Sequence, residues 1–152
     1  MSYGNDQRAT STPLTPQRAL QSVLAALAAG MISEAVDRFD DDFTYTDHGL
    51  DLTFVDKELL TRFFQKSREL FPDTMVEANA VFENGDVAVA EWKLRATNIV
   101  PFGAARLRDR VSLSGVSVIQ TRNGRITRWF DYYDGAKSRR VELAAHFKEW
   151  VE

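Results

Sequence analysis

Residues 123–134 read Asn-Gly-Arg-Ile-Thr-Arg-Trp-Phe-Asp-Tyr-Tyr-Asp, a tight turn that leads directly into a strand. The Asn-Gly pair is typical of a two-residue turn between antiparallel strands. Side chains of a strand alternate between the two faces of its sheet. One face is therefore expected to carry Thr127, Trp129, Asp131 and Tyr133, with the acid between two aromatic rings.

Further strands are expected before this one. Apolar and polar residues alternate from Val76 to Phe82, and Asn-Gly-Asp at 84–86 predicts a hairpin turn into a strand over 87–96. Another strand is expected over about 106–121, and the last over 125–134. Strands joined by such short turns pair antiparallel.

The first half of the chain has helical spacing. Thr15 followed by Pro16 is typical of a helix start, because the hydroxyl caps a free N–H and proline suits the first helical position. Apolar residues then recur at helical spacing until Gly30. We expect a second short helix over 31–39 and a third, strongly amphipathic one over 56–71.

Between the second and third helices, residues 43–47 (Phe-Thr-Tyr-Thr-Asp) predict a strand. The three aspartates at 40–42 are interpreted as a solvated turn before it. A cation site is the alternative, but consecutive carboxylates on an extended chain point apart. No metal site is therefore predicted.

Helices followed by a long-stranded meander indicate an α+β domain with helices on one side of the sheet. The tail over 136–151 is expected to add a closing helix. We expect a flexible segment over 1–14 and a single domain over 15–152, with no internal repeat.

Composition narrows the functional classes. The chain has 152 residues, 44% of them hydrophobic and 27% charged, which is ordinary for a globular protein. A net charge of −3 with mixed signs argues against nucleic acid as a partner. No stretch reaches the roughly 18 apolar residues of a membrane span. There are no cysteines, which excludes disulfides and thiolate sites, and we expect a cytoplasmic protein.

Asp131 is the main candidate for chemistry. A carboxyl group between aromatic rings loses solvation, which raises its pKa and makes it a proton donor or acceptor near neutral pH. The alternative is a structural acid that pairs with Arg128 or Arg95. Two interpretations are also open for Trp92 and Trp129, because aromatic side chains can line a ligand pocket or simply pack in the core.

Three segments carry a resemblance to a known family: Phe39–Asp47, Ala90–Leu94 and Asn123–Asp134. Together they resemble the nuclear transport factor 2-like superfamily, and in particular its SnoaL-like polyketide cyclase branch, over about residues 19–134. The resemblance implies a cone-shaped α+β fold (nuclear transport factor 2-like, cystatin-like), in which a bent antiparallel sheet wraps around N-terminal helices and an internal pocket.

Enzymes of this superfamily imply roles for individual residues. In SnoaL-like cyclases the general acid/base falls on Asp131, whereas the histidine partner falls on Ser117 and is therefore missing. In limonene epoxide hydrolase the catalytic acid also falls on Asp131, and the residues that position water fall on Tyr45 and Asp47. The arginine and second aspartate of that enzyme are not in register with residues 91–94, Glu-Trp-Lys-Leu.

Ketosteroid isomerase implies a different arrangement. Its general base falls on Asp47, but its oxyanion donors fall on Val23 and Val116, which cannot donate a hydrogen bond. His48 follows the strand end and is expected either at the pocket mouth or as a solvated loop residue.

The predicted site thus has three catalytic and five substrate-binding candidates. The catalytic candidates are Asp131, Asp47 and Tyr45, and the substrate-binding candidates are Trp92, Trp129, Tyr133, Ser117 and His48. The expected activity is cyclase-like, isomerase-like or hydrolase-like proton transfer on a small apolar oxygenated ring compound, with no cofactor.

Two other classes stay open. One is a small-molecule-binding module in which Asp131 only hydrogen-bonds the ligand, and the other is an interaction domain. The opposite sheet face is expected to carry Val116, Val118, Phe130 and Tyr132, an apolar surface that a monomer would rarely expose. We therefore expect a symmetric homodimer through that face, as is common in such relatives.

Overall fold

The computed structural model describes residues 12–102 and 105–135, which form three helices and six strands. In chain order these are α1 (Pro16–Ala28), α2 (Ile32–Asp37), β1 (Phe39–Asp47), β2 (Leu52–Phe54), α3 (Lys57–Leu70), β3 (Met75–Asn84), β4 (Val87–Phe102), β5 (Ala105–Arg122) and β6 (Arg125–Tyr133). The predicted α+β class is confirmed. The closing helix predicted over 136–151 and most of the predicted segment 1–14 lie outside the described residues.

All the strands belong to one sheet in the order β2-β1-β6-β5-β4-β3. Strands β3 to β6 form the predicted antiparallel meander. Asn123 and Gly124 make the last turn, both with positive φ angles (53° and 77°), as a two-residue hairpin loop requires. Strand β1 differs, because it pairs with β6 in parallel. The hairpin turns carry no information about this pair, which joins distant parts of the chain.

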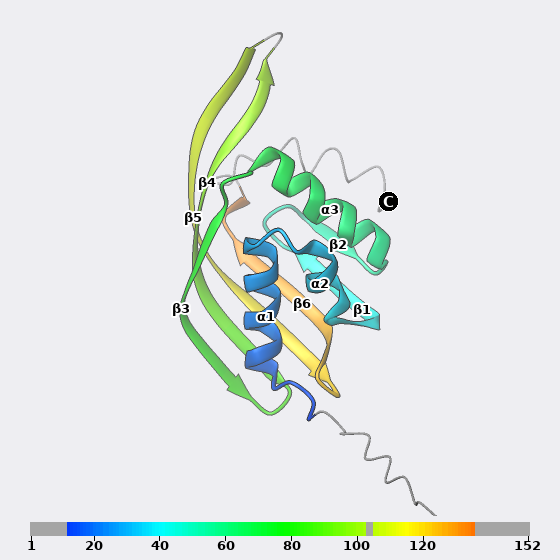
Figure 1. Cartoon of the computed structure of the whole chain (residues 1–152). Helices are drawn as coiled ribbons and strands as arrows, with labels where there is room; N and C mark the ends of the chain where they lie inside the picture. The colour runs from blue at the N-terminus through cyan, green and yellow to red at the C-terminus, as the bar shows by residue number, and fades with distance from the viewer. Residues whose placement is uncertain (1–11, 103–104, 136–152) are drawn as a thin grey trace, which may run out of the picture.

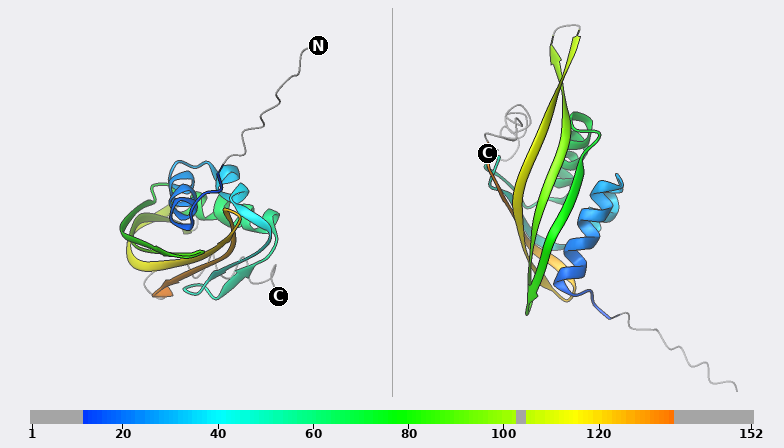
Figure 2. Two further views of the ribbon diagram at one scale, coloured as in Figure 1. Left: turned by 90° about the horizontal axis from the view of Figure 1, so that it is seen from below. Right: turned by 90° about the vertical axis from the view of Figure 1, so that its left-hand side faces the viewer.

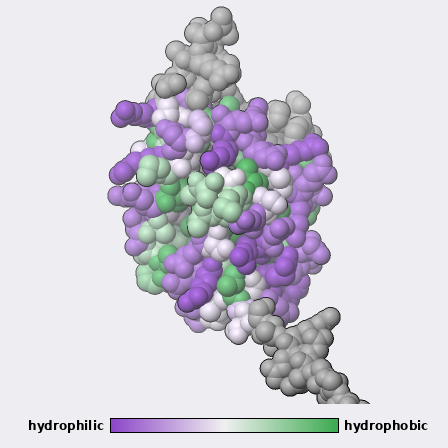
Figure 3. All heavy atoms as spheres, in the orientation of Figure 1, coloured by the Kyte–Doolittle hydropathy of each residue, from purple (hydrophilic) through white to green (hydrophobic). Residues whose placement is uncertain are grey.

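The sheet is strongly bent, and the three helices lie against its concave face (Figures 1 and 2). Helix α3 buries Leu60, Phe63 and Phe64 on one side, as its apolar spacing predicts. Hydrophilic residues cover most of the helix-bearing side (Figure 3). The arrangement is the expected cone, with apolar residues turned inward.

Two helix starts follow from local capping. The Thr15 hydroxyl accepts a hydrogen bond from the Arg18 N–H at 3.3 Å, and the Asp56 carboxylate accepts one from the Leu59 N–H at 2.9 Å. Caps of this kind stabilise a helix by about 1 kcal/mol each. They set where α1 and α3 begin and so hold the apolar faces of these helices over the sheet.

The strand β1 begins earlier than its sequence suggests. The aspartates at 40–42 belong to the strand and do not form a turn before it. Phe39 pairs with Ile126 and Thr44 with Arg128, so the register shifts between them. This irregular stretch lets polar residues lie within a strand whose ends are buried.

The alternation predicted for residues 76–82 breaks in the middle of β3. Ala78 pairs with Trp92 and Ala80 with Glu91, which leaves one extra residue between them. Such a bulge reverses the faces of the residues that follow. Phe82, expected on the buried face, is consequently 65% exposed, and Val81 packs against the core in its place.

Gly115 on β5 leaves space for an indole ring of the neighbouring strand. A Cβ atom at this position would overlap the six-membered ring of Trp92 and would lie 2.7 Å from the Tyr132 carbonyl oxygen. Gly115 pairs directly with Trp92 in the sheet. The glycine therefore determines where that indole lies on the concave face.

We expect Gly115→Ala to lower the free energy of unfolding by about 1–3 kcal/mol, the usual cost of overpacking. Urea denaturation followed by far-UV circular dichroism measures this change. Ser114→Ala, an exposed change on the adjacent residue, should stay within about 0.5 kcal/mol of the parent protein. Equal effects of the two substitutions would contradict the packing argument.

Candidate active site

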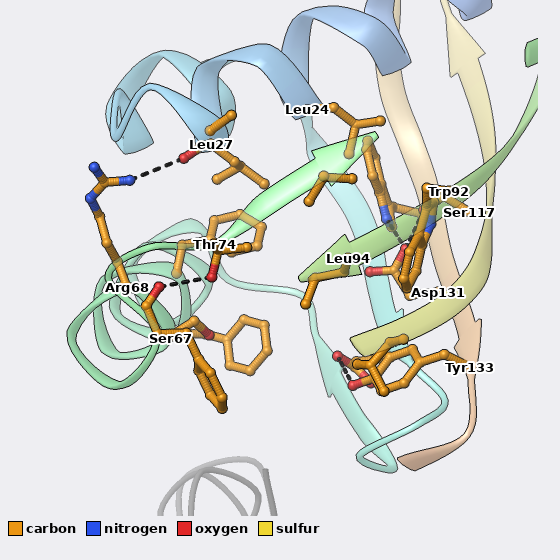
Figure 4. Close-up of a pocket in the computed structure, with 18 of the residues that line it drawn as sticks. Leu24, Leu27, Ser67, Arg68, Thr74, Trp92, Leu94, Ser117, Asp131 and Tyr133 are labelled. Atoms are coloured by element: carbon orange, nitrogen blue, oxygen red, sulfur yellow. Dashed lines mark hydrogen bonds between the residues drawn. The ribbon is translucent and has the colours of Figure 1, made fainter. Parts of the chain in front are cut away.

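A cavity of about 160 Å³ lies between the helices and the concave face of the sheet. An apolar cavity of roughly 150 Å³ binds benzene in an engineered protein, so this one has room for a ring-sized molecule. The wall is largely apolar, with polar groups gathered in two places (Figure 4). The lining includes Leu24, Leu27, Ile32, Tyr45, Asp47, Phe63, Phe64, Ser67, Arg68, Phe71, Thr74, Val76, Trp92, Leu94, Val111, Leu113, Ser117, Trp129, Asp131 and Tyr133.

Asp131 on β6 faces this cavity and accepts three hydrogen bonds from uncharged groups. The Ser117 hydroxyl donates to Oδ1 at 2.5 Å, and the Trp129 indole N–H donates to the same oxygen at 2.7 Å. The Tyr45 hydroxyl donates to Oδ2 at 2.6 Å. Strands β1, β5 and β6 each supply one donor, so the carboxyl group is fixed from three sides.

The direction of the Ser117 hydrogen bond is fixed by its neighbour. The Trp92 indole N–H donates to the Ser117 hydroxyl oxygen at 2.9 Å, and an indole can only donate. Ser117 therefore turns its own hydrogen toward Asp131. The resemblance implied a histidine partner at this position, and in this structure Ser117 is a hydrogen-bond donor to the acid.

The pKa of Asp131 is raised from 3.8 to about 6. Burial is the main cause, because it removes water from the charged form, and the nearby charge of Asp47 raises the pKa further. The hydrogen bonds from Ser117, Tyr45 and Trp129 lower it in part. The carboxyl group can therefore take up and release a proton close to neutral pH.

The alternative in which Asp131 pairs with an arginine is not observed among the described residues. None of their ion pairs includes Asp131. The Arg128 guanidinium lies 4.6 Å from the centre of the Phe130 ring, and both residues alternate with Asp131 along β6. An arginine at Asp131 would lower the pKa of the acid and remove its capacity to exchange a proton near pH 7.

Tyr45 is packed among aromatic rings and stays protonated. Its ring is stacked on Trp129, with centroids 6.2 Å apart, and meets Phe64 edge-on at 5.6 Å. Burial, followed by the charges of Asp131 and Asp47, raises the pKa of Tyr45 well above its usual value near 10. Tyr45 is accordingly a hydrogen-bond donor and not a base.

Asp47 is the second acid of the site, and its oxygens are already engaged. The Tyr133 hydroxyl lies 2.7 Å from Oδ1 and 2.9 Å from Oδ2 of Asp47. The Leu50 N–H donates to Oδ1 at 2.9 Å, which closes the turn after β1. Asp47 is only 1% exposed. Asp47 therefore holds Tyr133 and the turn in place by hydrogen bonds, and its charge raises the pKa of Asp131.

His48 does not line the cavity, contrary to one of the two sequence interpretations. Side chains alternate along β1, so the residue after Asp47 points to the outer face. The exposed His48 ring is stacked on Tyr132 at 4.4 Å and meets Phe130 edge-on at 5.6 Å. The parity of the strand was the signal that excluded His48 from the pocket.

Three polar residues of the cavity wall were not predicted from the sequence: Ser67, Arg68 and Thr74. The spacing carried a signal for two of them, because Ser67 follows Phe63 and Arg68 follows Phe64 by four positions on α3, so both lie on the buried face of the helix. Thr74 belongs to a loop, where no periodicity indicates direction. Its hydroxyl donates to the Phe71 carbonyl oxygen at 2.8 Å.

Two features are absent from the part of the chain that the structure describes: a cluster of metal-ligating side chains and a membrane-spanning helix. No group of three or more His, Asp or Glu side chains there could hold a metal ion. Likewise, no described helix is long and apolar enough to cross a membrane.

Comparisons with known proteins agree with this architecture. Residues 20–129 match the sequence profile of the SnoaL-like domain, and the match ends two residues before Asp131. The resemblance inferred from the sequence is therefore confirmed. Among curated proteins, none matches the chain significantly.

Several solved structures are similar to this chain. IdmH, a candidate polyketide cyclase from Streptomyces antibioticus, is 16% identical, with a TM-score of 0.70 over 82% of this chain and 96% of its own. An LEH-like epoxide hydrolase from M. tuberculosis is 17% identical, with a TM-score of 0.64 over 90% of this chain and 96% of its own. An NTF2-like protein from Burkholderia thailandensis is 13% identical, with a TM-score of 0.70 over 85% and 98%. Identities this low establish the fold alone.

The raised pKa of Asp131 predicts a pH-dependent stability. Because the folded-state pKa exceeds the unfolded value, the contribution of this group to stability is present below about pH 4 and is lost as the pH rises through about 6. Relative to Asp131→Asn, the free energy of unfolding of the parent protein should fall by up to about 3 kcal/mol between pH 4 and pH 8.

Urea denaturation at pH 4, 6 and 8 measures this difference. Asp51→Asn removes an exposed carboxylate from a turn and serves as the control. A difference between parent and Asp131→Asn that does not change with pH would show that Asp131 titrates like an exposed acid.

Proposed function

This chain belongs to the SnoaL-like domain family, and we propose that it is a cofactor-independent enzyme in which Asp131 moves a proton on a small apolar oxygenated ring compound. Cyclase-like or isomerase-like chemistry fits best. The observation that carries the proposal is a carboxyl group at a largely apolar cavity, held by uncharged donors, with its pKa raised to about 6.

The hydrogen bonds of Asp131 indicate which oxygen carries the proton. Oδ1 already accepts hydrogen bonds from the Ser117 hydroxyl, whose oxygen is engaged by Trp92, and from the Trp129 indole, which can only donate. Oδ2 faces only the Tyr45 hydroxyl among these donors, and a hydroxyl can accept as well as donate. The proton is therefore expected on Oδ2.

In the proposed reaction Asp131 acts first as a base and then as an acid. As a base, Asp131 takes a proton from a ring carbon next to a carbonyl group, and the electron pair of the broken C–H bond moves onto the carbonyl oxygen to form an enolate. The acid then returns the proton to another atom of the ring or to the oxygen. Tyr45 orients the reacting group because its hydroxyl lies beside Oδ2 at the cavity wall.

Asp47 has a positioning role in this proposal. Its charge keeps the pKa of Asp131 high, and it holds Tyr133 at the wall of the pocket. Trp92 acts through Ser117, whose hydrogen it directs toward the acid. Trp129 contributes both an apolar surface and a donor.

Epoxide hydrolysis by a three-residue arrangement has less support. On β4, Glu91 and Lys93 are exposed, while Trp92 lies between them and lines the cavity. Neither charged residue is on the pocket face. The particular oxyanion donors of ketosteroid isomerase have less support as well, because one of their positions is taken by Val23, which is buried in the core and cannot donate a hydrogen bond.

A ligand-binding module without catalysis is the second candidate. One observation favours it, namely that the inner polar groups hydrogen-bond to one another. Mass spectrometry of organic extracts from the purified protein tests whether an apolar compound is retained.

We also propose a cytoplasmic location. The sequence contains no cysteines, and this supports a reducing compartment such as the cytoplasm.

We expect the protein to catalyse hydrogen–deuterium exchange at the benzylic position of 2-tetralone, an apolar ring ketone, in D₂O. Proton NMR follows the loss of the benzylic signal. Asp131→Asn should lower the protein-dependent rate by about 100-fold or more, because the amide cannot act as a base. Binding of 2-tetralone, measured by quenching of tryptophan fluorescence, should be retained.

Tyr132→Phe is the matched control, because it changes a side chain of the same strand on the opposite face, and its exchange rate should equal that of the parent. Exchange that survives in Asp131→Asn would remove the assignment of the acid. Binding without any exchange in the parent protein would favour the ligand-binding module.

We further propose a symmetric homodimer through the outer face of the sheet. Tyr132 is 44% exposed there, and Val116, Val118 and Phe130 are half-buried beside it. The stacked His48 ring extends this apolar surface. Burial of such a face against a second copy is favourable, because its apolar area leaves water.

We expect Tyr132→Glu to convert the dimer to a monomer at micromolar concentration, as measured by light scattering. A charge at the centre of a buried symmetric interface is introduced twice and repels itself. Met31→Glu changes an apolar residue of similar exposure (45%) at the start of α2, away from the outer face of the sheet, and should leave the mass unchanged. A monomeric parent protein would contradict the proposal.

A further inference from the structure

The cavity has a second polar end, which proton transfer by Asp131 does not use. Arg68 on α3 lines the cavity together with Ser67 and Thr74. Figure 4 places Arg68 beside α1, across the pocket from Asp131 and Trp92. Apolar side chains such as Leu27 and Leu94 lie between the two ends.

The guanidinium group of Arg68 has more N–H donors than its hydrogen bond to α1 uses. Its Nη1 lies 3.4 Å from the Leu27 carbonyl oxygen, which already accepts from the Gly30 N–H at 3.1 Å. Within the described residues, Arg68 takes part in none of the ion pairs. A guanidinium carries five N–H donors and binds carboxylates with two of them in parallel. Arg68 is thus available for a ligand.

Gly30 provides the place in which this guanidinium rests. A Cβ atom at Gly30 would lie 2.7 Å from Cζ, 2.8 Å from Nη2 and 2.9 Å from Nε of Arg68. The near-equal distances mean that the planar group lies flat over the glycine. Gly30 also ends α1 with a φ angle of +74°, where glycine is favoured. The end of α1 therefore holds Arg68 at the cavity wall.

The charges along the cavity orient any ionised ligand. Asp47 and Asp131 lie at the inner end, and Arg68 is the one positively charged side chain among the described residues that line the cavity. An anionic group is repelled at the inner end and attracted at the Arg68 end. A ligand with a single carboxylate is therefore favoured in one orientation only.

We propose that Arg68 is a specificity-determining residue that binds a carboxylate of the ligand. The ligand class is then an apolar ring compound with a carboxylate at one end. The ring lies toward Asp131, and the carboxylate lies between α1 and α3 at Arg68. This inference rests on the proposed function for the location of the ligand and adds the chemical group that the pocket recognises.

The test compares two probes of the same shape, 2-naphthoate and 2-naphthamide, by isothermal titration calorimetry at pH 8. The parent protein should bind the carboxylate about fivefold more tightly than the amide, the upper range for an exposed charge pair. Arg68→Gln should abolish this preference and leave the affinity for the amide unchanged.

Arg62→Gln removes the same charge from the same helix at a residue outside the cavity lining, and it should keep the full preference. Equal binding of the two probes by the parent protein, or binding of neither, would overturn the inference. So would a loss of both affinities in Arg68→Gln, because a structural role of Arg68 would then explain the result.

Asp131→Asn separates this inference from the proposed function. The variant should keep the preference for 2-naphthoate although it has lost the exchange reaction. A preference that persists when the parent protein catalyses no exchange would leave Arg68 as a ligand-recognition residue and remove only the catalytic proposal.

Discussion

The parallel pairing of β1 with β6 is the constraint on which the site depends. In this register Tyr45 lies beside Trp129 and Asp47 beside Asp131, while Ser117 flanks Asp131 from β5. A shift of one residue in this register would reverse the faces of β1 and move the side chains of Tyr45 and Asp47 to the outer face. The pairing thus brings two acids and their donors to one place on the concave face.

The second constraint is electrostatic. A carboxyl group withdrawn from water needs hydrogen bonds, and the partners of Asp131 are a hydroxyl, a phenol and an indole and not a cation. Neutral donors satisfy its lone pairs without stabilising the charge as strongly as an arginine would. The positive charge of Arg68 lies across the cavity, where it can meet a ligand without lowering the pKa of the acid.

Agreement between sequence and structure is best where interactions are local. The hairpin turn at Asn123 and Gly124, the caps of α1 and α3, and the inward face of β6 all depend on residues close in the chain. The expectations that were wrong involve pairings that a single segment does not encode. A bulge opposite β4 exposed Phe82, and pairing with β6 drew the aspartates at 40–42 into a strand.

The sequence by itself determined the α+β class, the antiparallel meander and the identity of Asp131 as the acid of the last strand, because periodicity and turn chemistry act over a few residues. The tertiary structure alone decided that Tyr45 and Ser117 donate to that acid, that Asp47 holds Tyr133, and that Arg68 lines the opposite end of the cavity. These contacts join strands and helices far apart in the chain, and only the bending of the sheet around its helices brings them within reach of one another.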